Sequence, residues 1–173
     1  ILVTDGKPQT STDHSGYLHF LLMGGWYLLL KFLGFVSASS LSDILQAPVP
    51  REAFIELVGA SRVFSGIFVG LIGAIFFLGL KSLTGNRTIA TVASLILVVT
   101  TGFVEQAIRI HTELFSALFA YTALFLILAA SRTNRIRGFI WLGLAATAAV
   151  LALLSKLQAL PLLLSFPLIA LAF

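Results

Sequence analysis

The sequence of 173 residues contains no cysteine, and only 10% of its residues are charged. Without cysteine, the chain has no disulfide, no thiolate nucleophile and no zinc–sulfur site. A soluble domain of this length carries roughly a quarter charged residues, so the scarcity of charge indicates that lipid is the solvent. The chain is instead 58% hydrophobic, with a mean hydropathy of +1.03. These values predict an integral membrane protein.

A dense basic patch is lacking as well. The formal net charge is +4, but the cations are spread between hydrophobic blocks. This distribution excludes the concentrated positive surface that binds nucleic acids. We therefore expect membrane lipids, and no nucleic acid, among the partners.

Uninterrupted apolar runs mark the expected membrane spans. A helix needs roughly 17–25 apolar residues to cross a bilayer core, whereas barrel strands alternate polar and apolar residues. Five stretches reach this length: residues 63–80, 88–104, 114–130, 138–155 and 157–173. We expect an all-α polytopic transmembrane helix bundle over 62–173, with about five spans. The last span is still apolar at the final residue and the first residue is not methionine, so we expect a piece of a longer protein.

Residues 1–61 have a different pattern, which predicts an outer-face loop with interfacial amphipathic helices. Residues 17–30 are apolar and aromatic, and their tryptophan and tyrosines suit the headgroup region. Residues 37–50 predict a loop, because serines and prolines punctuate them. Residues 51–61 predict a short amphipathic helix that leads into the first span.

The charges are divided unequally between the connectors. Residues 81–87 and 131–137 hold five cations and no acid, so the positive-inside rule places both connectors in the cytoplasm. All seven acids and all three histidines then fall on the opposite face. We therefore expect the chemistry on the non-cytoplasmic face.

Four segments in a fixed order resemble a known family. They read DHSGYLHFLLMGGWYLLLKFLG, GASRVFSGIFVGLIGAIFF, EQAIRIHTELFSALFAYTALFLIL and GLAATAAVLALLSKLQALPLLL. Their order and spacing are similar to those of the integral-membrane GT-C glycosyltransferases, in the branch of protein O-mannosyltransferases and aminoarabinose transferases. The resemblance implies an enzyme of a bacterial inner (plasma) membrane that uses a polyprenyl-phosphate-linked sugar. It implies a periplasmic or extracellular active face and an acceptor glycan, lipid or protein.

Such a transfer needs a base near the acceptor and positive charge near the departing phosphate. Asp13 is the first candidate for the base and Asp5 is the second, and His14 is a candidate contact of the donor. Asp13 has a second interpretation as the N-cap of a helix that begins near residue 15. The acidic pair that family members carry after their first helix is absent, so the choice between the two carboxylates stays open. A divalent cation, Mg²⁺ or Mn²⁺, is compatible with this chemistry.

Arg109, His111 and Glu113 form the densest polar cluster in the sequence. In a helix that begins near Arg109, residues 109 and 113 share a face, so Arg109 can bind phosphate while Glu113 orients it. The alternative is a surface ion pair of little energetic value. His111 is a weaker candidate as a metal ligand, because the sequence places no second ligand beside it.

Lys156 lies between two apolar stretches with almost no connector around it. A charge at such a place binds a ligand or partner, or extends its ammonium group to the interface. Phosphate binding is the functional hypothesis, and Gln158 is placed to add a hydrogen bond to the sugar or the phosphate. Arg62 begins the first span, where it either anchors the helix at the headgroups or contacts the donor.

Two alternatives come from other functional classes: a transporter or channel fragment, and a structural subunit of a membrane complex. Transporters place charged or broken-helix elements near the membrane midplane, whereas the five apolar stretches have uncharged interiors. Gly66, Gly70 and Gly73 recur at near-helical spacing in the first span, which predicts close helix packing rather than a ligand site.

Overall fold

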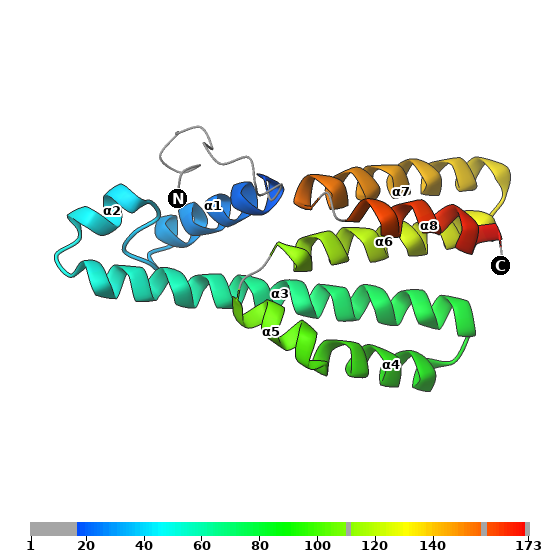
Figure 1. Cartoon of the computed structure of the whole chain (residues 1–173), viewed down its shortest axis with the longest axis horizontal. Helices are drawn as coiled ribbons and strands as arrows, with labels where there is room; N and C mark the ends of the chain where they lie inside the picture. The colour runs from blue at the N-terminus through cyan, green and yellow to red at the C-terminus, as the bar shows by residue number, and fades with distance from the viewer. Residues whose placement is uncertain (1–16, 110–111, 157–158, 172–173) are drawn as a thin grey trace.

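The computed structural model describes residues 17–109, 112–156 and 159–171. In chain order the helices are α1 (Tyr17–Phe32), α2 (Leu41–Gln46), α3 (Pro50–Thr84), α4 (Arg87–Val99), α5 (Thr101–Arg109), α6 (Glu113–Ser131), α7 (Arg135–Ser155) and α8 (Leu160–Leu171). The described residues contain no strand, and the helices lie roughly along one long axis (Figure 1). The predicted all-α architecture is therefore confirmed for this part of the chain.

The longest helix, α3, extends through most of the molecule. Its 35 residues correspond to about 52 Å at 1.5 Å per residue, whereas a bilayer core is about 30 Å thick. Pro50 lies in its first turn, where a missing N–H costs nothing, and Gly85 caps its end in the left-handed conformation (φ 67°). Residues 51–61 are thus the first part of α3, and the prediction of a separate short helix there is wrong.

The second apolar stretch forms two helices rather than one. α4 and α5 meet at Thr100 and are bent by 53°. The Thr100 N–H donates to the carbonyls of Ile96 and Leu97, and its hydroxyl donates to the Leu97 carbonyl (2.7 Å). These bonds pair two of the last carbonyls of α4 locally, at the point where the chain changes direction. The predicted single helix over 88–104 is therefore broken.

α6 and α7 form an antiparallel hairpin with a contact face of small residues (Figure 1). Ala120, Ala123, Ala148 and Ala152 are buried in one cluster, which α8 completes with Phe166. Small side chains let helix backbones approach closely, which is how helices associate where lipid replaces water. The hairpin is therefore the tightest part of the bundle.

α1 packs along the half of α3 that begins at Pro50. The Trp26 indole donates to the Ala60 carbonyl (3.0 Å) and stacks on Phe64 at a centroid distance of 5.5 Å. The Tyr27 hydroxyl is hydrogen-bonded to the Ser61 hydroxyl. The polar atoms expected to anchor an interfacial helix at the headgroups thus bond to α3 instead.

The segment 37–50 contains a helix that the sequence analysis assigned to a loop. Ser40 and Asp43 form a capping box at the start of α2, in which each side chain accepts from the other residue's backbone N–H. Asp43 also accepts from the Ser39 N–H (2.8 Å) and the Lys31 ammonium (2.7 Å). Serine favours loops and N-caps for the same physical reason, so the loop prediction missed this short helix.

Three helices, α3, α6 and α7, are long and apolar enough to cross a membrane. The bent pair α4–α5 makes a fourth if it is counted as one span. The sequence predicted about five, and the described part of the fifth is α8, with 12 residues. Large apolar side chains such as Leu95, Ile96 and Val99 are more than half exposed, which suits lipid surroundings.

The glycines of α3 differ in what lies beside them. A Cβ atom on Gly73 would lie 3.0 Å from the Val98 side chain of α4, and one on Gly79 would overlap the Phe125 ring of α6. Nothing lies within 4 Å of a Cβ added to Gly66 or Gly70. The predicted close packing therefore holds at Gly73 and is wrong for Gly66 and Gly70.

Candidate functional site

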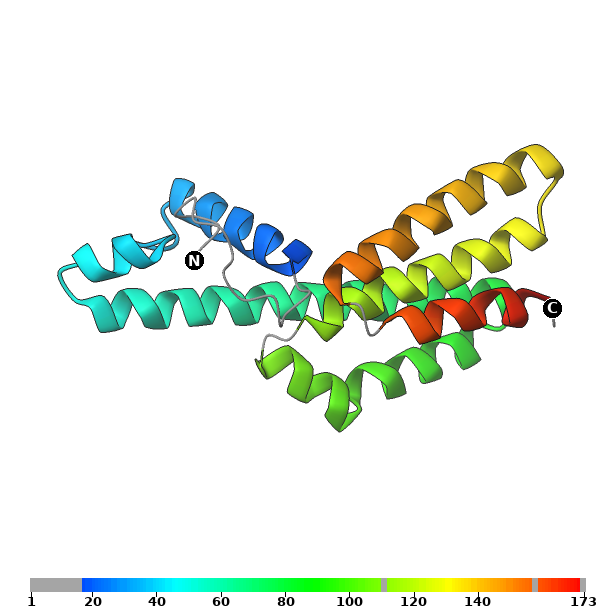
Figure 2. The same cartoon turned by 45° about the horizontal axis from the view of Figure 1, so that its top comes forward.

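The fold separates charge between the two ends of the helix bundle. The Arg132 guanidinium donates to the Ser82 carbonyl (3.0 Å), which joins the last turn of α3 to the connector that follows α6 at one end of the bundle (Figure 2). Glu113 begins α6 and Lys156 follows α7, so both lie at the opposite end of the hairpin. The 19 residues of α6 separate these ends by about 28 Å.

We call the end that holds Glu113 and Lys156 the polar end. The cationic end is the opposite one, with Lys81, Arg87, Arg132, Arg135 and Arg137. Within the described residues, Glu113 and the cationic connectors thus lie at opposite ends of the hairpin, as the sequence predicted.

An ion pair between Lys156 and Glu113 is the centre of the candidate site. The Lys156 ammonium donates to a carboxylate oxygen of Glu113, and the two side chains are 23% and 36% exposed. Lys156 is the C-cap of α7 and donates its N–H to the Ala152 carbonyl (2.9 Å). Glu113 is the first residue of α6, where the helix dipole favours a carboxylate. Two helix ends therefore hold a half-buried pair that remains partly accessible.

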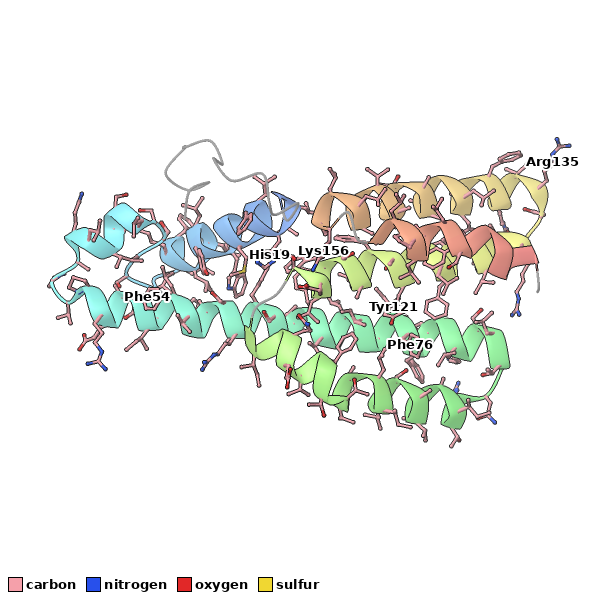
Figure 3. All side chains as sticks on the ribbon, viewed as in Figure 1. His19, Phe54, Phe76, Tyr121, Arg135 and Lys156 are labelled. Carbon is pink, nitrogen blue, oxygen red and sulfur yellow. The ribbon has the colours of Figure 1, made fainter. Side chains whose placement is uncertain are left out.

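His19 of α1 is buried at the same end, with 5% of its surface exposed. Its ring meets Phe115 edge-on at a centroid distance of 4.6 Å, and Phe115 lies two residues after Glu113. Figure 3 shows His19 and Lys156 close to the junction of α1 with α6 and α7. The His19 imidazole is therefore buried near the start of α6, where Glu113 of the ion pair lies.

Aromatic rings pack together beneath Glu113 at the start of α6. Phe115 is fully buried and lies 4.2 Å from Phe68 and 5.7 Å from Phe64, measured between ring centroids. Met23 and Leu114 complete this core. The packing of Phe115 against these α3 rings fixes the position of the start of α6, and therefore of Glu113, relative to α3.

The structure separates Arg109 from Glu113. Arg109 is the last residue of α5 and Glu113 the first of α6, so the predicted shared helix face is wrong. That prediction depended on the helix beginning near Arg109, whereas α6 begins at Glu113. Arg62 lies on α3 with an exposed side chain, next to Ser61, which faces α1.

Five of the predicted site residues lie outside the described part of the chain: Asp5, Asp13, His14, His111 and Gln158. Their proposed roles stay predictions. Among the residues that are described, no three His, Asp or Glu side chains come together as ligands for a metal ion.

Two of the seven acids have structural tasks far from the polar end. Asp43 is held by Lys31 and by Ser39, and these hydrogen bonds keep the pKa of its carboxyl well below the usual range. Glu56 accepts from the Ser37 N–H (2.8 Å) and hydroxyl (2.7 Å). The Asp43 contacts join α2 to the end of α1, and the Glu56 contacts join the segment between α1 and α2 to α3, so both carboxylates have structural partners.

His19 and Gln106 carry buried polar atoms and were not among the predicted site residues. The Gln106 Oε1 atom of α5 is buried and accepts no hydrogen bond from the described residues. For His19 the available signal was its position within the apolar helix α1, which marks a functional candidate in a membrane protein, whereas Gln106 lies among the polar residues of α5 and gave no such signal. Pairing of Glu113 with Lys156 had no signal at all, because 43 residues separate them.

Comparisons of the chain with protein-family models, with curated proteins and with solved structures found no match. The functional assignment consequently depends on the site itself and on the resemblance of the four sequence segments.

Proposed function

We propose that the chain belongs to a membrane glycosyltransferase that moves a sugar from a polyprenyl-phosphate donor to an acceptor at the non-cytoplasmic face. The observation that carries the proposal is the half-buried Lys156–Glu113 pair at the end opposite the cationic connectors. The four segments that resemble GT-C glycosyltransferases contain both of these residues. A bacterial inner membrane with a periplasmic or extracellular active face fits the same distribution of charge.

Lys156 is the proposed contact of the donor phosphate. An ammonium group in a partly desolvated site binds phosphate oxygens strongly, and the negative charge that develops on the departing phosphate strengthens this bond. In the protein without donor, the Lys156 ammonium is paired with the Glu113 carboxylate. Donor binding would replace the Glu113 carboxylate by phosphate, so that Glu113 regulates access to Lys156. The apolar helix faces beside the site suit the polyprenyl chain.

The transfer itself requires a base at the acceptor. The bond between the anomeric carbon and the phosphate oxygen breaks, and polyprenyl phosphate leaves with the electron pair. The acceptor oxygen or nitrogen bonds to the anomeric carbon and gives its proton to a carboxylate. Asp13 is the proposed base and Asp5 the second choice, because Asp13 precedes α1 by four positions and α1 packs against α7. Mg²⁺ or Mn²⁺ is proposed to help stabilise the negative charge on the departing phosphate.

The bent pair α4–α5 is the feature that most favours a transporter instead. Discontinuous spans in transporters coordinate ions through carbonyls that the break leaves unpaired. Here the Ile96 and Leu97 carbonyls at the end of α4 accept hydrogen bonds from Thr100. Two of the carbonyls at this break are thus already engaged within the chain, which makes them less suited to an ion and favours the glycosyltransferase.

The direct test is sugar release by the full-length protein in proteoliposomes, with a panel of radiolabelled polyprenyl-phosphate sugars. We expect Lys156→Met and Asp13→Asn each to lower turnover by about 10²-fold or more. Lys31→Met is the matched control, because it also breaks a lysine–carboxylate pair but at the distant Asp43. EDTA added to the same assay tests the divalent cation.

Failure of the full-length protein to release sugar from any donor would count against the enzyme. Equal turnover by the Lys156→Met and Lys31→Met variants would remove Lys156 from the site. Counterflow of a labelled solute through the same vesicles, without sugar release, would favour the transporter.

A further inference from the structure

Three of the five side chains at the cationic end occupy places that helix electrostatics disfavour. Arg87 is the first residue of α4, Arg135 is the first of α7 and Arg137 is the third. The start of a helix carries partial positive charge, so a cation there is destabilising. Lys81 and Arg132, in contrast, lie at the ends of α3 and α6, where cations are favourable.

The two helices that begin with these three cations, α4 and α7, contain no Asp or Glu. Residues 57–104 and 114–173 contain no Asp or Glu. The side chains of Arg87, Arg135 and Arg137 are exposed, and Figure 3 shows Arg135 directed away from the bundle at the start of α7. The Arg132–Ser82 hydrogen bond joins the last turn of α3 to the connector that follows α6, so the positive charges share one face. Among the described residues no carboxylate pairs with these arginines, so an anion from another molecule can offset their charge.

Exposed apolar side chains lie among the same cations. Ile89 is 53% exposed in the first turn of α4, and Ile136 and Phe139 are 77% and 63% exposed at the start of α7. A soluble anion would cover the charges and leave these side chains in water. An anionic phospholipid covers both, because its phosphate meets the arginines while its acyl chains meet the apolar groups.

We propose that the cationic end binds the headgroups of anionic phospholipids in the leaflet that it faces, and that this contact stabilises the starts of α4 and α7. The inference uses the charges and exposure of these residues alone and is independent of the glycosyltransferase proposal.

The test is the thermal unfolding midpoint of the full chain in vesicles of phosphatidylcholine, with and without 30 mol % phosphatidylglycerol. We expect phosphatidylglycerol to raise the midpoint by about 2–4 °C. The triple variant Arg87→Gln/Arg135→Gln/Arg137→Gln should lose this gain. Arg51→Gln is the matched control, because Arg51 also lies in the first turn of a helix but beside Glu52 and at the other end of the molecule. It should keep the gain in full.

Charge reversal gives a second test with the opposite sign. Arg135→Glu places an acid at the start of α7, so it should raise the midpoint by about 1–3 °C in phosphatidylcholine alone. In phosphatidylglycerol the same variant should gain less than the wild type. This crossing of effects distinguishes lipid binding from simple damage to the fold.

Three results would overturn the proposal. One is an equal gain from phosphatidylglycerol in the wild type and the triple variant. Another is no gain in the wild type. The third is a gain of the same size from inorganic phosphate in phosphatidylcholine vesicles, since this would identify the ligand as a soluble anion.

Discussion

Replacing Lys156 by methionine removes the ammonium group from the polar end but keeps most of the side-chain volume. Exposed ion pairs couple by about 0.2–1 kcal/mol, whereas breaking a fully buried pair costs about 3–5 kcal/mol. The Lys156 and Glu113 side chains are 23% and 36% exposed, which lies between these limits. We therefore expect a coupling energy of about 1–2 kcal/mol in a double-mutant cycle of Lys156→Met with Glu113→Gln.

The assay is unfolding in mixed detergent micelles at pH 7, followed by far-UV circular dichroism. The double variant should be more stable than the sum of the single losses predicts, because it leaves no unbalanced charge. The Lys31–Asp43 pair, with a lysine that is 42% exposed, provides a comparison cycle with a smaller coupling energy. Coupling between Lys156 and Glu113 below that of the Lys31–Asp43 pair would refute the assignment of a half-buried ion pair.

Two further predictions concern packing and pH. Gly79→Ala forces a methyl group into the Phe125 ring and should destabilise the protein by about 1–3 kcal/mol in thermal unfolding, whereas Gly70→Ala meets open space and should be neutral or stabilising; equal effects would contradict the close approach of α3 to α6. Because the folded state lowers the pKa of Asp43, its contribution should be complete above about pH 5 and decline progressively as the pH falls further. Thermal melts of wild type and Asp43→Asn should therefore differ at pH 7 and converge at low pH, and a constant difference would contradict this linkage.

The first and last residues of α6 and α7 were predictable to within a few positions, because charged residues flank the apolar run of each helix. The uncharged runs 114–130 and 138–155 correspond to helices Glu113–Ser131 and Arg135–Ser155. In each case the helix extends only a few residues past the run, since charged residues can cap a helix but are costly inside the bilayer.

The continuity of α3 and the break at Thr100 were not predictable on this basis. The pattern is amphipathic in residues 51–61 and becomes uniformly apolar after them. This change alters the surroundings of the helix but does not interrupt its backbone. Thr100 lies within an uncharged run, and hydropathy carries no information on a local hydrogen bond to Leu97. Tertiary packing decides both features.

The candidate site was predictable only as a set of separate residues. Hydropathy identified Lys156 as an unusual charge, and composition identified Glu113 within a polar cluster. Their meeting depends on the antiparallel return of α7 along α6, which no spacing rule in the sequence encodes. His19 joins them only because α1 packs against α6 and α7.

The central claim is that the polar and cationic ends lie on opposite sides of the membrane, and labelling of introduced cysteines tests it most directly. The chain has no cysteine of its own, so Glu105→Cys and Thr133→Cys each create a single reactive site, and both positions are exposed. In intact cells a membrane-impermeant maleimide should label Glu105→Cys at once and Thr133→Cys only after permeabilisation. Labelling of both from the same side would contradict the account.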